Sequence, residues 1–144
     1  MLFENGRTAE SEEPYRRAVE MLPDNALLQI EYAQTLVALG GAHLDEAVSH
    51  LQIGLRREND NLLGWRLLGQ AYDGKNMPGQ ARLAAAEEHF NGQDMDGARM
   101  FAMRARLLLP RGTTDYRRAT DIVMASNPSE RELRDVAGEE RQGS

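Results

Sequence analysis

The sequence contains no cysteine and no long apolar run, and each absence excludes a class of protein. Without cysteine there is no disulfide framework, no thiolate chemistry and no cysteine-ligated metal. No apolar run approaches the roughly 20 residues of a membrane span, and residues 1–11 lack the basic start and apolar core of a signal peptide. The formal net charge of −6 argues against general nucleic-acid binding.

Catalytic motifs are also missing. The histidines do not form H-E-x-x-H, the serines lie in no G-x-S-x-G turn, and no glycine-rich phosphate loop is present. His50 and Glu46 lie one helical turn apart and could share a metal ion, but a solvated surface is the simpler interpretation. His89 has no such partner one turn earlier. We therefore expect no catalytic, cofactor-binding or metal-binding residue in this chain, and no enzyme activity.

What the chain has is alanine, leucine and an internal repeat. Alanine and leucine are frequent while valine and isoleucine are sparse, which favours helices over sheets. Trp65, Leu68, Gly69, Tyr72 and Ala81 have the spacing W-x2-L-G-x2-Y…A, which resembles a tetratricopeptide (TPR) repeat. The large side chains form one apolar stripe of a helix, and the glycine leaves room for a second helix.

The neighbouring segments repeat this pattern. Asn25 and Asn61 begin similar segments 61 − 25 = 36 residues apart, and Ala47 and Ala81 are 81 − 47 = 34 residues apart, near the TPR period. We predict helices over residues 24–40, 44–57, 62–76, 78–91, 95–109 and 113–125. The resemblance implies an all-α, TPR-like, right-handed α-solenoid of antiparallel helix pairs over residues 1–125. Residues 129–137 are expected to form a marginal helix, and residues 138–144 a disordered tail.

The N-terminal repeat is expected to be truncated. Gly6 suits a turn, and residues 11–22 match the second helix of a repeat whose first helix is missing. This suggests a piece of a longer protein, with a naturally frayed terminus as the alternative. The loss would uncover Tyr15, Ala18, Val19 and Leu22, so we expect the chain either to fray before about Asp24 or to form a homodimer through this end.

Two surfaces are candidates for partner binding. The first helices of TPR pairs line a concave face, and the positions predicted to point outward from it are Ile30, Gln34, Val37, Arg66, Gln70 and Asp73. A basic strip could grip an acidic partner, or could be a solvated face neutralised by nearby acids; it comprises Arg99, Arg104, Arg106, Arg111, Arg117 and Arg118. Met95, Met100 and Met103 with Phe101 form an adaptable patch or, more simply, core packing.

A narrower resemblance covers several short runs: Glu4-Asn5-Gly6-Arg7, Pro14-Tyr15-Arg16-Arg17-Ala18-Val19, Pro23-Asp24, Leu44-Asp45-Glu46-Ala47, Trp65-Arg66, Ala84-Ala85-Ala86-Glu87, Pro110-Arg111-Gly112 and Arg118-Ala119-Thr120-Asp121-Ile122. Together they resemble the C-terminal TPR region of bacterial periplasmic zinc metallopeptidases involved in outer-membrane protein quality control. In that family an H-E-x-x-H protease domain precedes the repeats. The motif is absent here, so no catalytic residue carries over, and zinc would belong to the parent protein alone.

The resemblance implies a protein–protein interaction scaffold located in the periplasm, with a protein or peptide as partner. A TPR domain of another periplasmic assembly factor, such as those of cytochrome c biogenesis, would show much of the same pattern. A structural self-association module is a further alternative, and a cytoplasmic location stays open.

Overall fold

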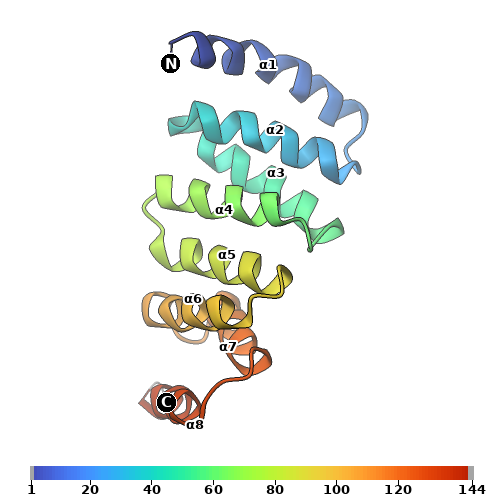
Figure 1. Cartoon of the computed structure of the whole chain (residues 1–144). Coiled ribbons are helices and arrows are strands. Elements are labelled where there is room, and N and C mark those ends of the chain that lie inside the picture. Colours follow the sequence, from blue (N-terminus) through green and yellow to red (C-terminus); the bar gives the residue numbers. More distant parts are fainter. Residues whose placement is uncertain (1, 143–144) are drawn as a thin grey trace. The chain divides into compact units, whose positions relative to one another are not determined.

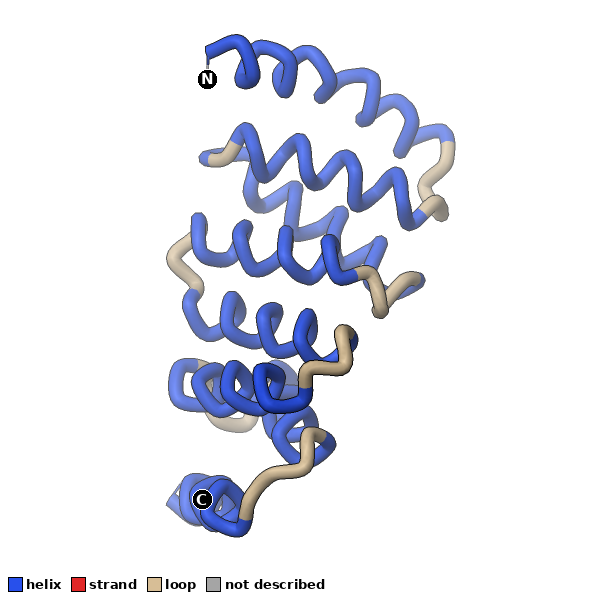
Figure 2. Tube along the Cα trace, viewed as in Figure 1, coloured by secondary structure: helices blue, strands red, loops and turns tan. Residues whose placement is uncertain are grey.

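The computed structural model describes residues 2–142, and every regular element in this range is helical. The all-α prediction is therefore confirmed for the described residues (Figure 2). The chain divides into two compact units, Met1–Met77 and Pro78–Ser144, referred to below as unit 1 and unit 2. Within residues 2–142, no helix combines the length and apolar character that a membrane crossing requires.

Unit 1 contains four α-helices and one short 3-10 helix. They are α1 (Leu2–Met21), α2 (Ala26–Leu39), η1 (Gly41–His43), α3 (Leu44–Arg57) and α4 (Leu62–Gly74). Each α-helix packs on the next, and α2 also contacts α4, so that these two lie side by side with α3 behind them (Figure 1).

Local signals define where these helices begin and end. The Oδ1 atom of Asn25 accepts from Leu28 N at 3.1 Å, and that of Asn61 accepts from Gly64 N at 2.9 Å. Each asparagine thus satisfies a backbone N–H that has no acceptor within its helix. Gly40 ends α2 in a left-handed conformation with φ 68°. The same cap at two sites 36 residues apart shows that the sequence repeat is also a structural one.

The core of unit 1 follows the predicted apolar stripes. On α2 the side chains of Tyr32, Ala33 and Leu36 are buried, and on α3 those of Leu51 and Leu55 are buried. Val19 from α1 joins the same cluster as Tyr32 and Leu36.

Helix α1 differs from the prediction, because it continues without a turn at Gly6 and contains Pro14. A glycine inside a helix costs about 1 kcal/mol relative to alanine and does not by itself end it. Ion pairs one turn apart, Arg16–Glu12 and Arg17–Glu13, support the second half. The expected fraying before Asp24 is also wrong, since Val19 is buried within unit 1.

Unit 2 contains α5 (Pro78–Asn91), α6 (Met95–Leu108), α7 (Thr114–Ala125) and α8 (Glu130–Gln142). Helix α5 packs on α6, α6 on α7, and α5 also contacts α7. The core is rich in alanine. Its fully buried members are Ala86, Ala98, Ala102, Ala105, Ala119, Ile122 and Val123.

Helix α8 is longer than predicted. Ser129 and Glu132 form the expected capping box, in which Ser129 N donates to Glu132 Oε1 and Glu132 N donates to Ser129 Oγ. The helix then continues to Gln142, where residues 138–142 were expected to be disordered. The reason is tertiary, because Val136 is buried and Glu139 pairs with Arg106. Residues 143 and 144 of the expected tail lie outside the described range.

Candidate interaction surface

The exposed side of α2 and α4 carries four of the six residues predicted to face a partner. Gln34, Arg66, Gln70 and Asp73 are exposed. Gln34 and Gln70 occupy equivalent positions of the repeat, since 70 − 34 = 36. The two helices are neighbours, so unit 1 places these polar side chains on adjacent helices.

The other two predicted residues do not face outward. Ile30 is 1% exposed, and Val37 is half-buried against the core of unit 1. Ile30 fills a space that two glycines leave, because a Cβ at Gly54 would lie 2.9 Å from its Cγ1 and one at Gly64 would lie 3.3 Å from its Cδ1. The prediction for Ile30 is wrong, since the neighbouring helices enclose a side chain that α2 alone would leave outside.

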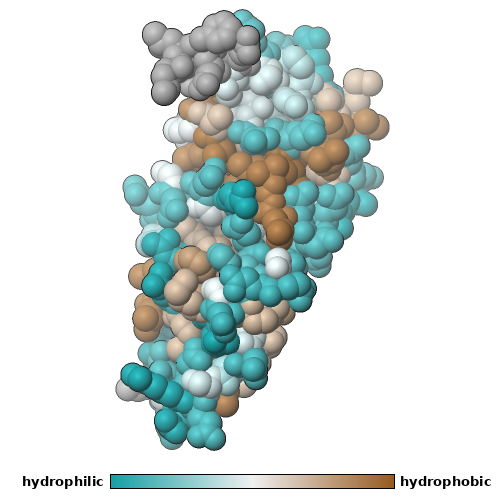
Figure 3. Space-filling model, in the orientation of Figure 1, coloured by the Kyte–Doolittle hydropathy of each residue, from teal (hydrophilic) through white to brown (hydrophobic). Residues whose placement is uncertain are grey.

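The same surface has an apolar end that the sequence reasoning missed. Leu27 is 54% exposed on the first turn of α2, and Leu63 is 39% exposed at the equivalent position of α4. Met21 and Leu22, at the end of α1, are 79% and 55% exposed. Figure 3 shows apolar surface on this face of unit 1. The 36-residue offset between Leu27 and Leu63 was the available signal.

A polar network centred on Tyr32 joins α1, α2 and α3. The Tyr32 hydroxyl lies 3.1 Å from Glu12 Oε1 and 3.1 Å from Glu46 Oε1, and accepts from Arg16 Nε at 3.4 Å. A phenol has one hydrogen, so it donates to one of the two carboxylates at a time. Burial, with the carboxylates beside it, raises the pKa of Tyr32 to about 12. The network therefore holds a neutral phenol at the junction of three helices.

His50 belongs to this network and not to the solvated surface we predicted. Its Nδ1 lies 2.6 Å from Gln29 Oε1, its Nε2 lies 3.6 Å from Glu46 Oε1, and its ring lies 4.8 Å from that of Tyr32. The described residues include no group of three or more side chains able to hold a metal ion.

His89 has a partner that helical spacing did not predict. Its Nδ1 lies 2.8 Å from Oδ2 of Asp94, which is across the turn between α5 and α6. Asp94 also caps α6 by accepting from Gly97 N. These two hydrogen bonds, that from Gly97 first, hold the pKa of Asp94 below its ordinary value.

The basic strip predicted for residues 99–118 is not a continuous surface. Arg99 pairs with Glu132, Arg106 with Glu139 and Arg118 with Glu87. The side chain of Arg106 is 0% exposed and pairs with Glu139, so it is enclosed while α8 is in place. Arg104, Arg111 and Arg117 are exposed. Arg99, Arg106 and Arg118 are paired because they face acidic residues on other helices of unit 2. Neutralisation by nearby acids was the alternative to partner binding that the sequence left open.

The methionines of α6 also differ from one another in how far they are buried. Met103 and Phe101 pack against the core of unit 2, and Met95 is half-buried. Met100 is 43% exposed. The four side chains therefore do not form one exposed patch.

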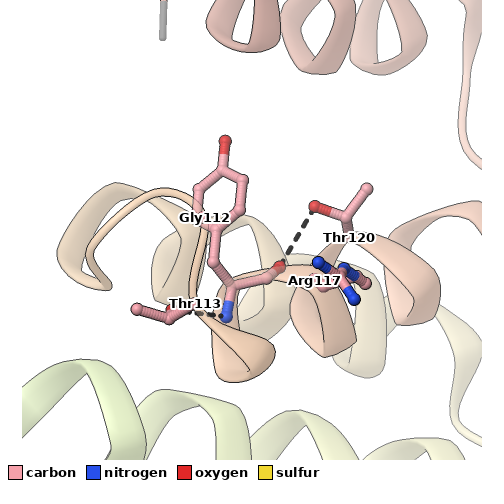
Figure 4. Close-up of a pocket in the computed structure, with 5 residues that line it drawn as sticks. Gly112, Thr113, Arg117 and Thr120 are labelled. Carbon is pink, nitrogen blue, oxygen red and sulfur yellow. Dashed lines mark hydrogen bonds between the residues drawn. The ribbon is translucent and has the colours of Figure 1, made fainter. Parts of the chain in front are cut away.

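A small hollow opens beside the start of α7 (Figure 4). Its volume is about 210 Å³, below the roughly 300–1,000 Å³ of typical small-molecule sites. The hydroxyls that line it are already engaged. Thr113 Oγ1 donates to Pro110 O and accepts from Tyr116 N, while Thr120 Oγ1 donates to Tyr116 O and accepts from Arg106 Nε. These hydroxyls bond to the protein itself, so they do not mark the hollow as a ligand site.

Comparison with known proteins does not extend this description: no protein-family model matches the chain, and no curated protein is significantly similar to it.

Proposed function

We propose that this chain is a TPR-type helical-repeat scaffold that binds a segment of another protein across α2 and α4. The observation that carries the proposal is the repeated presentation of side chains by these two helices. Leu27 and Leu63 are exposed at one pair of equivalent positions, and Gln34 and Gln70 at another. A surface whose chemistry repeats from one helix to the next suits an extended segment that crosses both helices.

The two pairs would have different roles in binding. Leu27 and Leu63 would cover an apolar side chain of the partner, with a gain proportional to the apolar area removed from water. Gln34 and Gln70 lie about two helical turns further along, and each amide can both donate to and accept from a peptide backbone. Arg66 adds a guanidinium one turn before Gln70, which suits a carboxylate of the partner.

The test uses peptides selected on the full chain from a random 12-residue library displayed on phage. We expect Arg66→Ala/Gln70→Ala to weaken binding of the selected peptides by about tenfold or more, measured by fluorescence anisotropy, because about 1.4 kcal/mol of contact energy is lost. The matched control is Ser49→Ala/Arg56→Ala on α3, which also changes two exposed residues. Unchanged affinity in the first variant, with helical content intact, would move the site away from α2 and α4.

We further propose, on the resemblance of the sequence alone, that the chain is the non-catalytic TPR part of a periplasmic zinc metallopeptidase. A TPR domain of another assembly factor is the alternative, and an H-E-x-x-H motif upstream in the full gene would distinguish the two.

Self-association through the N-terminal end is also a proposal. Met21 and Leu22 support it, whereas Val19 does not, because it is buried within unit 1.

A further inference from the structure

Two ion pairs connect α8 to α6 within unit 2, and their members are equally far apart along the two helices. Arg99 Nε lies 2.9 Å from Glu132 Oε2, and Arg106 Nη1 lies 2.5 Å from Glu139 Oε2. The offsets are equal, since 132 − 99 = 33 and 139 − 106 = 33, so α8 runs in the same direction as α6. Seven residues correspond to about 10.5 Å along a helix. Two carboxylates at that separation therefore face two guanidinium groups at the same separation.

The apolar part of the attachment is small. Among the described side chains of α8, the buried apolar one is Val136, while Leu133 is 38% exposed. Helix α7, by contrast, buries Tyr116, Ala119, Ile122 and Val123. The linker before α8 is not helical and includes Asn127 at φ 59°. Helix α8 is therefore held by the two ion pairs together with the burial of Val136.

The two arginines are oriented by groups other than α8. Arg106 donates from Nε to Thr120 Oγ1 at 2.8 Å and from Nη2 to Tyr116 OH at 2.8 Å. Arg99 donates from Nη2 to Asp96 Oδ1 at 2.8 Å, and from Nη1 to the backbone oxygens of Ser126 at 2.5 Å and Asn127 at 3.3 Å. These bonds leave Nη1 of Arg106 and Nε of Arg99 directed at the carboxylates of α8. A receptor that is already oriented loses less entropy when it binds.

We propose that the side of α6 carrying Arg99 and Arg106, together with the core cluster that Val136 joins, is a docking site for an acidic amphipathic helix of another protein. We name this surface the α8 seat. The helix it fits has carboxylates at positions i and i+7 and a branched apolar side chain at i+4, the pattern of Glu132, Val136 and Glu139. In the free chain α8 occupies the seat, and its tether competes with a partner at an effective concentration in the millimolar range. The site is separate from the α2–α4 surface and does not depend on the function proposed for it.

The experiment uses the full chain and a fluorescein-labelled peptide with the sequence of residues 129–142, followed by fluorescence anisotropy. In Glu132→Gln/Glu139→Gln the chain's own helix loses its anchors, so we expect the peptide to bind about tenfold or more tightly than it binds the unchanged chain. Adding Arg99→Gln should reverse that gain, because it removes one of the two guanidinium groups that the peptide's carboxylates would meet. The matched control Glu130→Gln changes an exposed glutamate on the same helix and should leave the affinity unchanged.

Two further measurements make the result decisive. An alanine–glutamine helix that carries only the glutamate, valine and glutamate at i, i+4 and i+7 should bind the anchor-free variant within about tenfold of the α8 peptide, whereas moving the second glutamate to i+6 should abolish binding. If Arg99→Gln unfolds unit 2, the same peptide is instead titrated at raised salt, and its affinity should fall because salt screens the ion pairs.

No peptide binding to an anchor-free variant of native helical content would overturn the proposal. So would a dimer of the unchanged chain that the two glutamate changes abolish, because the occupant would then be a second copy.

Discussion

In unit 1 a neutral phenol joins three helices by hydrogen bonds, whereas in unit 2 three arginines each pair with a glutamate of another helix. Tyr32 connects Glu12 of α1 with Glu46 of α3, while Arg99, Arg106 and Arg118 each pair with a glutamate of another helix. The apolar cores differ as well. Unit 1 buries large side chains such as Ile30, Leu36 and Leu51, and unit 2 is built largely on alanine.

The difference shows how two all-helical units can reach stable packing with different side chains. Alanine removes little apolar area from water, so helices that meet through alanine gain less from each contact than helices that meet through leucine or isoleucine. Long arginine side chains then connect helices that the small residues bring close together. In unit 1 large apolar side chains fill more of the space between helices, and the Tyr32 hydroxyl joins α1, α2 and α3.

The largest effect should come from removing the buried guanidinium of Arg106 in unit 2. We expect Arg106→Ala to lower the free energy of unfolding by about 3–5 kcal/mol, because it leaves Glu139 and Tyr116 without their buried partner. Urea unfolding followed by circular dichroism measures the change.

The matched control is Arg117→Ala, which removes an exposed arginine and should alter the stability by no more than about 0.5 kcal/mol. A loss below about 1 kcal/mol in Arg106→Ala would show that α6, α7 and α8 do not depend on this charge, and the contrast between the units would fail.

A smaller effect is expected from overfilling unit 1. A Cβ at Gly54 would lie 2.9 Å from Ile30 Cγ1 and 3.2 Å from the backbone oxygen of Ala26. We expect Gly54→Ala to destabilise the protein by about 1–3 kcal/mol, although alanine is the better helix former. The measurement is again the free energy of unfolding in urea.

Gly138 provides the comparison, because a Cβ there meets nothing within 4 Å. Gly138→Ala should therefore stabilise α8 by up to about 1 kcal/mol through helix propensity alone. Equal stability of the two variants would mean that Ile30 has more room between α3 and α4 than its contacts indicate.

The smallest expected effect is the change in the free energy of unfolding per unit of pH that is due to Tyr32. Its pKa is raised to about 12, so between about pH 10 and pH 12 the unfolded chain gives up a proton that the folded chain keeps. Stability therefore falls as the pH rises through this range, by at most about 1.4 kcal/mol per pH unit. Tyr32→Phe should reduce this slope. The charged or titratable groups that face the hydroxyl and ring are Glu12, Arg16, Glu46 and His50.

The slope of stability against pH is the quantity to compare, because Tyr32→Phe also removes hydrogen bonds and so lowers stability at every pH. Equal slopes in the two proteins would show that Tyr32 is not the group responsible.

The positions of helices α2 to α7 could be read from the sequence because the signals that set them act within one helical turn. Asn25, Asn61 and Thr113 cap their helices, and Gly40 ends α2. The apolar periodicity likewise predicted the buried faces of α3, α6 and α7. Gly6 was the misleading signal, since a glycine permits a turn without requiring one.

Only the tertiary structure decided which outward-looking residues are enclosed and which charges are paired. Ile30 is buried because Gly54 and Gly64 lie on neighbouring helices, and Arg106 is buried because Glu139, 33 residues later, returns to it. Helical periodicity reports one face of one helix and contains no information about what another helix places against it. The repeat thus predicted where Gln34 and Gln70 lie, whereas the division of the basic strip followed from contacts across unit 2, where partners distant in sequence meet.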